Sequence, residues 1–131
     1  KSGLSLKPSP NGKVLLISSG DIISVIDANG TILATPSIRT LVEKCAWASD
    51  NETLYCAVPE NIPLNANLPF DFWTGDFSSS DRFVKYNYKT GQLQELKPAT
   101  GFDVGALLVP KEENYLIFLN KTDNSLYSIR L

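Results

Sequence analysis

The chain has 131 residues, and 43% of them are hydrophobic, which suits one globular domain with a hydrophobic core and excludes a disordered chain. Twelve basic and fourteen acidic residues give a net charge of −2 without the basic stripe of a duplex-binding protein, so we expect no nucleic-acid partner. Histidine is absent, which excludes Ser–His and Cys–His nucleophile pairs and histidine metal sites, and we expect a protein that is not an enzyme and holds no metal or cofactor.

The first forty residues or so alternate between apolar runs and turn residues. Pro10, Asn11 and Gly12 form one turn signal, and Asn29-Gly30 between two apolar runs is a strong hairpin signal. No segment of the chain shows the 3.6-residue period of an amphipathic helix. We expect four strands in this first unit, at residues 3–8, 14–18, 22–27 and 31–35.

Two further units follow with the same order of strands and turns. The second unit has four expected strands, and a long insertion, 59–80, separates its second strand from its third. The third unit ends after three expected strands. These strands are at residues 44–49, 53–58, 82–88 and 92–97 in the second unit and at 104–109, 114–119 and 125–131 in the third.

The three units predict an all-β fold of three four-stranded β-propeller blades, the last of them incomplete. Placing Ser9 on Ser49 gives a spacing of 40 residues, and placing Leu54 on Tyr115 gives 61, which is about 40 plus the insertion. Propeller blades typically take about 40–50 residues. We therefore divide a single domain into blades at 1–41, 42–103 and 104–131.

Strands such as 14–18 and 115–119 are apolar without alternation, as expected if each blade buries both faces against its neighbours. Propellers typically use about 4–8 blades, so three blades leave two apolar faces uncovered. We expect a partial propeller, or half of a six-bladed ring that closes by self-association.

The three units resemble WD-repeat-like, TolB-type β-propeller repeats. The similar stretches read SPNGKVLLIS…ISVIDANG, SDNETLYCAV…FVKYNYKTG and PKEENYLIFL…SLYSIRL. Such repeats carry a Ser-Pro-Asp-Gly turn before strand two and an Asp-x-x-Thr-Gly turn after strand three, and the third unit has lost the Pro, the Gly and the Thr-Gly turn. The resemblance covers nearly the whole chain and implies the propeller fold.

The second unit is similar to repeats in secreted or membrane-anchored bacterial proteins, which implies an extracytoplasmic location. The protein would then be periplasmic, secreted or anchored through a segment outside this chain. No apolar run approaches the roughly 18 residues of a membrane span. A chain that starts with Lys1 and not with Met resembles a processed or excised fragment.

The two cysteines lie in the first hairpin of the second unit. If Asp50 and Asn51 form the tip of a two-residue turn, Cys45 lies directly opposite Cys56, where Cα atoms about 4.5–5.5 Å apart suit a disulfide. The alternative is a pair of small buried thiols, because the same positions in the other units hold ordinary packing pairs. A catalytic CxxC role does not fit the spacing.

The insertion 59–80 gathers aromatic and acidic residues that suit a peptide or carbohydrate surface. It follows the second strand of its blade, so it lies opposite the turns after strands one and three, together with the interblade loops 36–42 and 98–103. The alternative is that the aromatic residues only cap the open end of the blade. The candidate binding residues are Phe70, Asp71, Phe72, Trp73, Asp76 and Phe77, with Arg39 and Arg82 as the basic residues within reach.

These features predict a non-catalytic binding or scaffold module of a bacterial extracytoplasmic protein, which engages a protein, peptide or carbohydrate on the face of loop 59–80. The alternative is part of the propeller of a larger enzyme, such as a peptidase, with catalysis outside this chain. A propeller glycosidase would need carboxylates that face one another across the channel, and no acid on the innermost strands is singled out.

Overall fold

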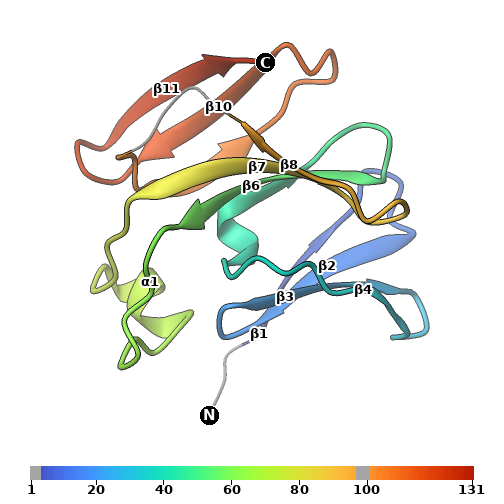
Figure 1. Ribbon diagram of the computed structural model, residues 1–131, viewed down its shortest axis with the longest axis horizontal. Helices are drawn as coiled ribbons and strands as arrows, with labels where there is room; N and C mark the ends of the chain where they lie inside the picture. Colours follow the sequence, from blue (N-terminus) through green and yellow to red (C-terminus); the bar gives the residue numbers. More distant parts are fainter. Residues whose placement is uncertain (1–3, 97–100) are drawn as a thin grey trace.

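The structure, a computed structural model, describes residues 4–96 and 101–131; the predicted strand ends at residues 3 and 97 and the first part of the predicted loop 98–103 lie outside these residues. The described residues form three antiparallel sheets, and neighbouring strands in each sheet follow one another in chain order. Figure 1 shows the sheets as stacked layers. The prediction of an all-β fold built from propeller blades is confirmed, and we name the sheets blades 1, 2 and 3.

Blades 1 and 2 each have four strands, and the described part of blade 3 has three. Blade 1 consists of β1 (Leu4–Pro8), β2 (Val14–Ser19), β3 (Ile22–Asp27) and β4 (Ile32–Ala34). Blade 2 consists of a 3-10 turn, η1 (Val42–Lys44), and of β5 (Cys45–Trp47), β6 (Thr53–Pro59), β7 (Asp81–Asn87) and β8 (Leu93–Leu96). Blade 3 consists of β9 (Val104–Leu108), β10 (Tyr115–Asn120) and β11 (Ser125–Arg130).

The turn between the first two strands of each blade fixes the repeat spacing. Gly12, Asn51 and Glu113 hold the same place in these turns: each has a positive φ (74°, 63° and 54°) and donates its backbone N–H to the carbonyl three residues earlier. From 12 to 51 is 39 residues, and from 51 to 113 is 62. The expected spacings of 40 and 61 are each wrong by one residue, which matters because successive strand residues point to opposite faces of a sheet.

Blade 2 lies between the other two blades. All seven residues of β6 are buried, whereas the middle strands of the outer blades alternate between buried and partly exposed side chains. This agrees with the expectation that three blades leave two apolar faces uncovered. In the single chain, only one face of each outer blade has a neighbouring blade to cover it.

Two apolar cores join the blades. In the first, Leu16 of β2 packs with Leu54 of β6, and in the second, Phe83 of β7 packs with Phe118 of β10, with ring centroids 5.1 Å apart. A hydrogen bond from Trp47 Nε1 to the carbonyl of Lys7 (3.0 Å) also links the first strands of blades 1 and 2. The stack is thus held by side-chain packing between sheets.

The two ends of the stack differ, as expected from strand order. At one end, the hairpin-turn side, the backbone N–H of Asn11 donates to Asn51 Oδ1 (2.8 Å), and Tyr55 donates to Glu113 Oε1 (2.9 Å). The opposite end, which we call the insertion side, carries residues 59–80 and the loop between β4 and η1. Figure 1 shows the insertion at the left of the stack and these hairpin turns at the right.

The sequence of the insertion led us to expect only a loop, but the insertion also contains a short helix. Residues Phe70–Thr74 form a single helical turn, α1, which ends at Gly75 in the left-handed conformation (φ 85°). One turn is too short to produce an apolar period, so the sequence pattern did not reveal it. Among the described residues, no helix is long and apolar enough to cross a membrane.

Candidate binding site on the insertion side

The first half of the insertion borders a cleft of about 510 Å³. The opposite wall comes from the β2–β3 turn and from the loop that leads into blade 2. Prolines and aliphatic side chains alternate along it with polar groups that can hydrogen-bond to a peptide backbone. The lining residues include Asp21, Arg39, Pro59, Asn61, Ile62 and Asn67.

Arg39 is the charged group at this cleft. Its Nη2 lies 2.8 Å from each carboxylate oxygen of Asp21, while most of the Arg39 side chain is exposed. The hydrogen bond and the charge of Asp21 both raise the pKa of Arg39. Because Arg39 carries further N–H donors, its remaining groups are available to a ligand carboxylate or carbonyl.

Arg82, the second basic residue expected within reach of the insertion, forms an ion pair outside the cleft. Its Nε lies 2.8 Å from Glu95 Oε2 on the neighbouring strand β8. Of the two arginines, only Arg39 lines the cleft.

Phe70 and Trp73 form an exposed aromatic pair on α1. Their ring centroids are 5.4 Å apart and their planes meet at 81°, an edge-to-face arrangement. Trp73 is 51% exposed, yet its Nε1 donates to Glu43 Oε2 at 2.6 Å. The indole is thus fixed against the start of blade 2 and presents its remaining surface to solvent.

Phe72 and Phe77 anchor the insertion. Phe77 is buried with Leu41 and Leu68, and Phe72 packs against the same cluster. The ammonium of Lys121 lies 4.4 Å from the centroid of the Phe72 ring, which is a cation–π contact. These two rings hold the insertion to the protein, as the capping interpretation required, while the other two remain exposed.

Asp71 and Asp76 stabilise the local turn. Asp71 Oδ2 accepts the backbone N–H of Asn67 (2.8 Å), and the Asp71 carbonyl accepts the N–H groups of Asp76 and Phe77. Asp76 Oδ2 accepts the hydroxyl of Thr74 (2.9 Å). Within the described residues, no group of three or more acidic or cysteine side chains is placed to hold a metal ion.

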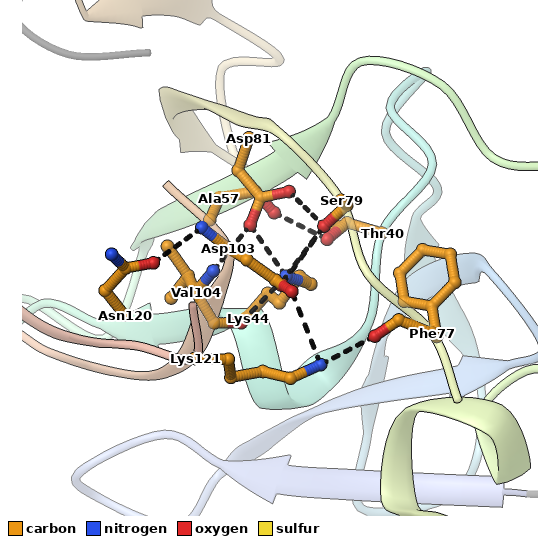
Figure 2. Close-up of polar contacts among 10 residues, drawn as sticks. All are labelled: Thr40, Lys44, Ala57, Phe77, Ser79, Asp81, Asp103, Val104, Asn120 and Lys121. Atoms are coloured by element: carbon orange, nitrogen blue, oxygen red, sulfur yellow. Dashed lines mark hydrogen bonds and ion pairs between the residues drawn. The ribbon is translucent and has the colours of Figure 1, made fainter. Parts of the chain in front are cut away.

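A buried ionic network lies beneath the insertion, and the sequence analysis missed it. Lys44 is fully buried, and its Nζ donates to Asp81 Oδ2 (2.6 Å), to the carbonyl of Val104 (2.7 Å) and to Asp103 Oδ1 (3.2 Å). Figure 2 shows this ammonium between the two carboxylates. Lys44 follows Glu43 within the mostly apolar stretch LVEKCAWA, and this position was the one signal in the sequence.

Further hydrogen bonds complete the network. Ser79 donates to Asp81 Oδ1 (2.6 Å), the N–H of Val104 donates to Asp81 Oδ2 (2.9 Å), and the N–H of Asp103 donates to Asn120 Oδ1 (3.0 Å). Figure 2 shows that these groups come from the insertion, from β7 and from blade 3. Because the side chains of Lys44 and Asp81 have no exposed surface, this cluster joins the blades and does not meet a ligand.

Lys121 connects the network to the surface of the insertion side. Its Nζ donates to the carbonyl of Phe77 (2.8 Å) and lies 3.7 Å from Asp103 Oδ2. Burial lowers the pKa of Lys121 more than the carboxylate of Asp103 raises it, and the ammonium of Lys44 lowers it as well. Lys121 thus fixes the end of the insertion relative to blade 3.

Cys45 and Cys56 are paired directly across β5 and β6, in the register expected from the turn at Asp50-Asn51. Their Cα atoms are 4.1 Å apart, and the two sulfurs form a disulfide. Both residues are fully buried in the core between blades 1 and 2. The bond lies away from the cleft and belongs to the scaffold.

No protein-family model matches the chain, and no curated protein matches it. Among solved structures, the chain is similar to a eukaryotic initiation factor, with 14% identity over 99% of this chain and 32% of that chain and a TM-score of 0.47. It is also similar to the β-propeller domain of Cps50 (Swd1) from Myceliophteria thermophila, with 10% identity over 99% of this chain and 54% of that chain and a TM-score of 0.41.

A third similar structure is the tricorn protease, with 11% identity over 97% of this chain and 21% of that chain and a TM-score of 0.36. The chain thus spans about a third, a half and a fifth of the three structures. The assignment of blades to this protein follows from the strand order and stacking of its own sheets.

Proposed function

We propose that the protein is a non-catalytic binding module of a bacterial extracytoplasmic protein, and that it holds an extended peptide segment of a partner protein on the insertion side. The observation that carries this proposal is the exposed Phe70–Trp73 pair on α1, which begins two residues after Leu68, a residue that lines the cleft of Arg39. Aromatic side chains and arginine are the residues that most often dominate binding energy at protein interfaces.

The site is preorganised for such a ligand. Phe72, Phe77 and the hydrogen bond from Trp73 to Glu43 fix α1 before any partner arrives, so less conformational entropy is lost on binding. Asn61 and Asn67 line the cleft with amide donors and acceptors that match a peptide backbone. The Cys45–Cys56 disulfide supports an oxidising, extracytoplasmic compartment.

The test is selection of a random linear peptide library on the immobilised protein, followed by affinity measurements with the enriched peptides. We expect binding to weaken by about tenfold or more in Trp73→Ala and in Phe70→Ala, as at interface hot spots. Leu93→Ala is the matched control, because Leu93 is an exposed apolar residue at the start of β8, near the hairpin-turn side.

Binding can also be followed by fluorescence, because the two tryptophans differ in exposure. Trp47 is buried and Trp73 is half exposed, so acrylamide should quench mainly Trp73, and a bound peptide should protect it. Peptides that bind both variants as tightly as the unmodified protein would contradict the proposal. So would a glycan array that yields Trp73-dependent ligands while the peptide library yields none.

A further inference from the structure

Each outer blade presents one uncovered apolar sheet face. The register of the strands and the alternation of burial define these two surfaces. The free face of blade 1 contains Leu6, Leu15, Ile17, Ile22, Ile26 and Ile32. The free face of blade 3 contains Ala106, Leu108, Tyr115, Ile117, Leu119 and Leu126. Contiguous apolar faces of this kind are rarely left in water.

The repeat spacing shows which covered face each free face corresponds to. With 39 residues between blades 1 and 2, Ile17 corresponds to Cys56, which faces blade 1. With 62 residues between blades 2 and 3, Ile117 corresponds to Tyr55, which faces blade 3. In blade 2, the residue equivalent to Ile17 faces the preceding blade, and the residue equivalent to Ile117 faces the following blade.

The two free faces are thus complementary halves of one repeated interface. Blade 1 lacks a preceding blade among the described residues, and blade 3 lacks a following one. A blade 1 face placed on a blade 3 face would reproduce the order already present twice within the molecule. It would also keep all hairpin turns on one side, because both existing interfaces do so.

We propose that the free face of blade 3 binds the free face of blade 1 of a second copy of this chain. The contact is head-to-tail, with a different surface on each copy, and such contacts form rings when the rotation between copies closes. Two copies would form a ring of six blades, which lies within the usual range of about 4–8. The cleft on the insertion side shares no lining residue with either face, although Ile22 of the blade 1 face bridges to Arg39 at the edge of the cleft.

The test measures the mass of the 131-residue chain in solution by light scattering and sedimentation over a wide range of concentration. We expect a dimer, at twice the chain mass of 14.4 kDa. Leu126→Glu on the free face of blade 3 and Ile32→Glu on that of blade 1 should each weaken association by about tenfold or more, because each buries a charge in the contact.

Both substituted side chains are well exposed in the single chain (74% for Leu126 and 62% for Ile32), so the variants should fold normally, which circular dichroism and urea unfolding would verify. Leu64→Glu is the control. Leu64 is also fully exposed and apolar, but it lies on the insertion and belongs to neither face. We expect this variant to remain a dimer.

Mixing the variants tests the head-to-tail arrangement. Leu126→Glu retains an intact blade 1 face, and Ile32→Glu retains an intact blade 3 face. An equimolar mixture should therefore form mixed dimers through one intact interface at concentrations where neither variant alone dimerises. A monomer at every concentration would overturn the proposal, as would association of either single variant that is as tight as that of the unmodified chain. Peptide binding by such a monomer would still leave the proposed function intact.

Discussion

At the scale of the residue, Lys44 is a fully buried charge that joins distant parts of the chain. It lies at the end of η1 and reaches Asp81 and Asp103, which are 37 and 59 residues away in the sequence. A buried ion pair is costly to form and is still more costly to break, because the remaining charges have no solvent. The network therefore fixes the position of blade 3 relative to blade 2, while its net contribution to the free energy of unfolding is small.

Lys44→Met should destabilise the protein by about 3–5 kcal/mol, because it leaves two buried carboxylates without a cation. The measurement is urea unfolding at neutral pH. Lys13→Met, at an exposed position of the first hairpin, is the control and should change the free energy of unfolding by less than about 0.5 kcal/mol. Equal effects of the two variants would show that the network does not act as described.

Asp50 acts at the tip of the β5–β6 hairpin. Its Oδ1 accepts the backbone N–H groups of Glu52 and Thr53 (2.9 Å each), and its Oδ2 accepts the Thr53 hydroxyl (2.7 Å). Burial raises the pKa of Asp50, but these hydrogen bonds and the charge of Lys85 together outweigh burial and lower it. Ionised Asp50 is therefore favoured in the folded state.

A lowered pKa in the folded state gives a stability contribution that is full above the unfolded pKa, near 4, and is lost as pH falls through the folded pKa. We expect Asp50→Asn to be less stable than the unmodified protein at pH 6. The difference should shrink as the pH falls below about 4, because the unmodified carboxyl becomes protonated there. Urea unfolding across this range measures it, and a difference that does not depend on pH would contradict the assignment.

At the scale of the element, the β5–β6 hairpin is the best-defined part of the chain. A tight turn sets its register, β6 is buried along its whole length, and the Cys45–Cys56 disulfide closes the hairpin between directly opposed residues. The insertion α1 shows the reverse case. Its single turn depends on contacts from Phe72 and Phe77 to the rest of the protein and not on intrinsic helix propensity.

Replacing both cysteines with alanine should lower the free energy of unfolding by about 2–3 kcal/mol, because the disulfide limits the entropy of the unfolded hairpin. Reductant should destabilise the unmodified protein by a similar amount and leave the double variant unchanged. Thiol titration of the denatured protein without reductant should find no free thiol. Two titratable thiols in freshly purified protein would show that the cysteines are reduced.

At the scale of the whole molecule, the number of sheet faces packed against another blade decides the local stability of each blade. Blade 2 has a neighbour on each face, whereas blades 1 and 3 each have one in the single chain. β11 lies at the edge of its sheet, and among the described residues no strand pairs with its outer side. The outermost strands of the blades should therefore open before β6 does.

Hydrogen exchange measured by mass spectrometry would show this gradient. We expect the amides of β6 to exchange slowest among the strands and those of β4 and β11 to exchange fastest. The amides of β6 exchange mainly through global unfolding, whereas those of β4 and β11 exchange through local opening. The comparison is internal, so each strand serves as a control for the others. Equal protection of β6 and β11 in the monomer would contradict the predicted order.

The sequence by itself determined the strands, the turns between them, the place of the insertion and the position of Cys45 opposite Cys56, but not whether the two cysteines form a disulfide. Each of these depends on local backbone preferences at residues such as Asn51, which are visible over a few positions. The spacings expected between blades were nevertheless each wrong by one residue, and an error of this size exchanges the two faces of a sheet, because side chains alternate along a strand.

Only the tertiary structure decided which residues meet. Nothing in the sequence links Lys44 to Asp81 and Asp103, and the ion pair of Arg82 with Glu95 depends on the pairing of β7 with β8. The same holds for Trp73, which the structure fixes through Glu43. Such contacts arise when sheets stack, and no local period or spacing encodes them, because packing joins residues that are distant along the chain.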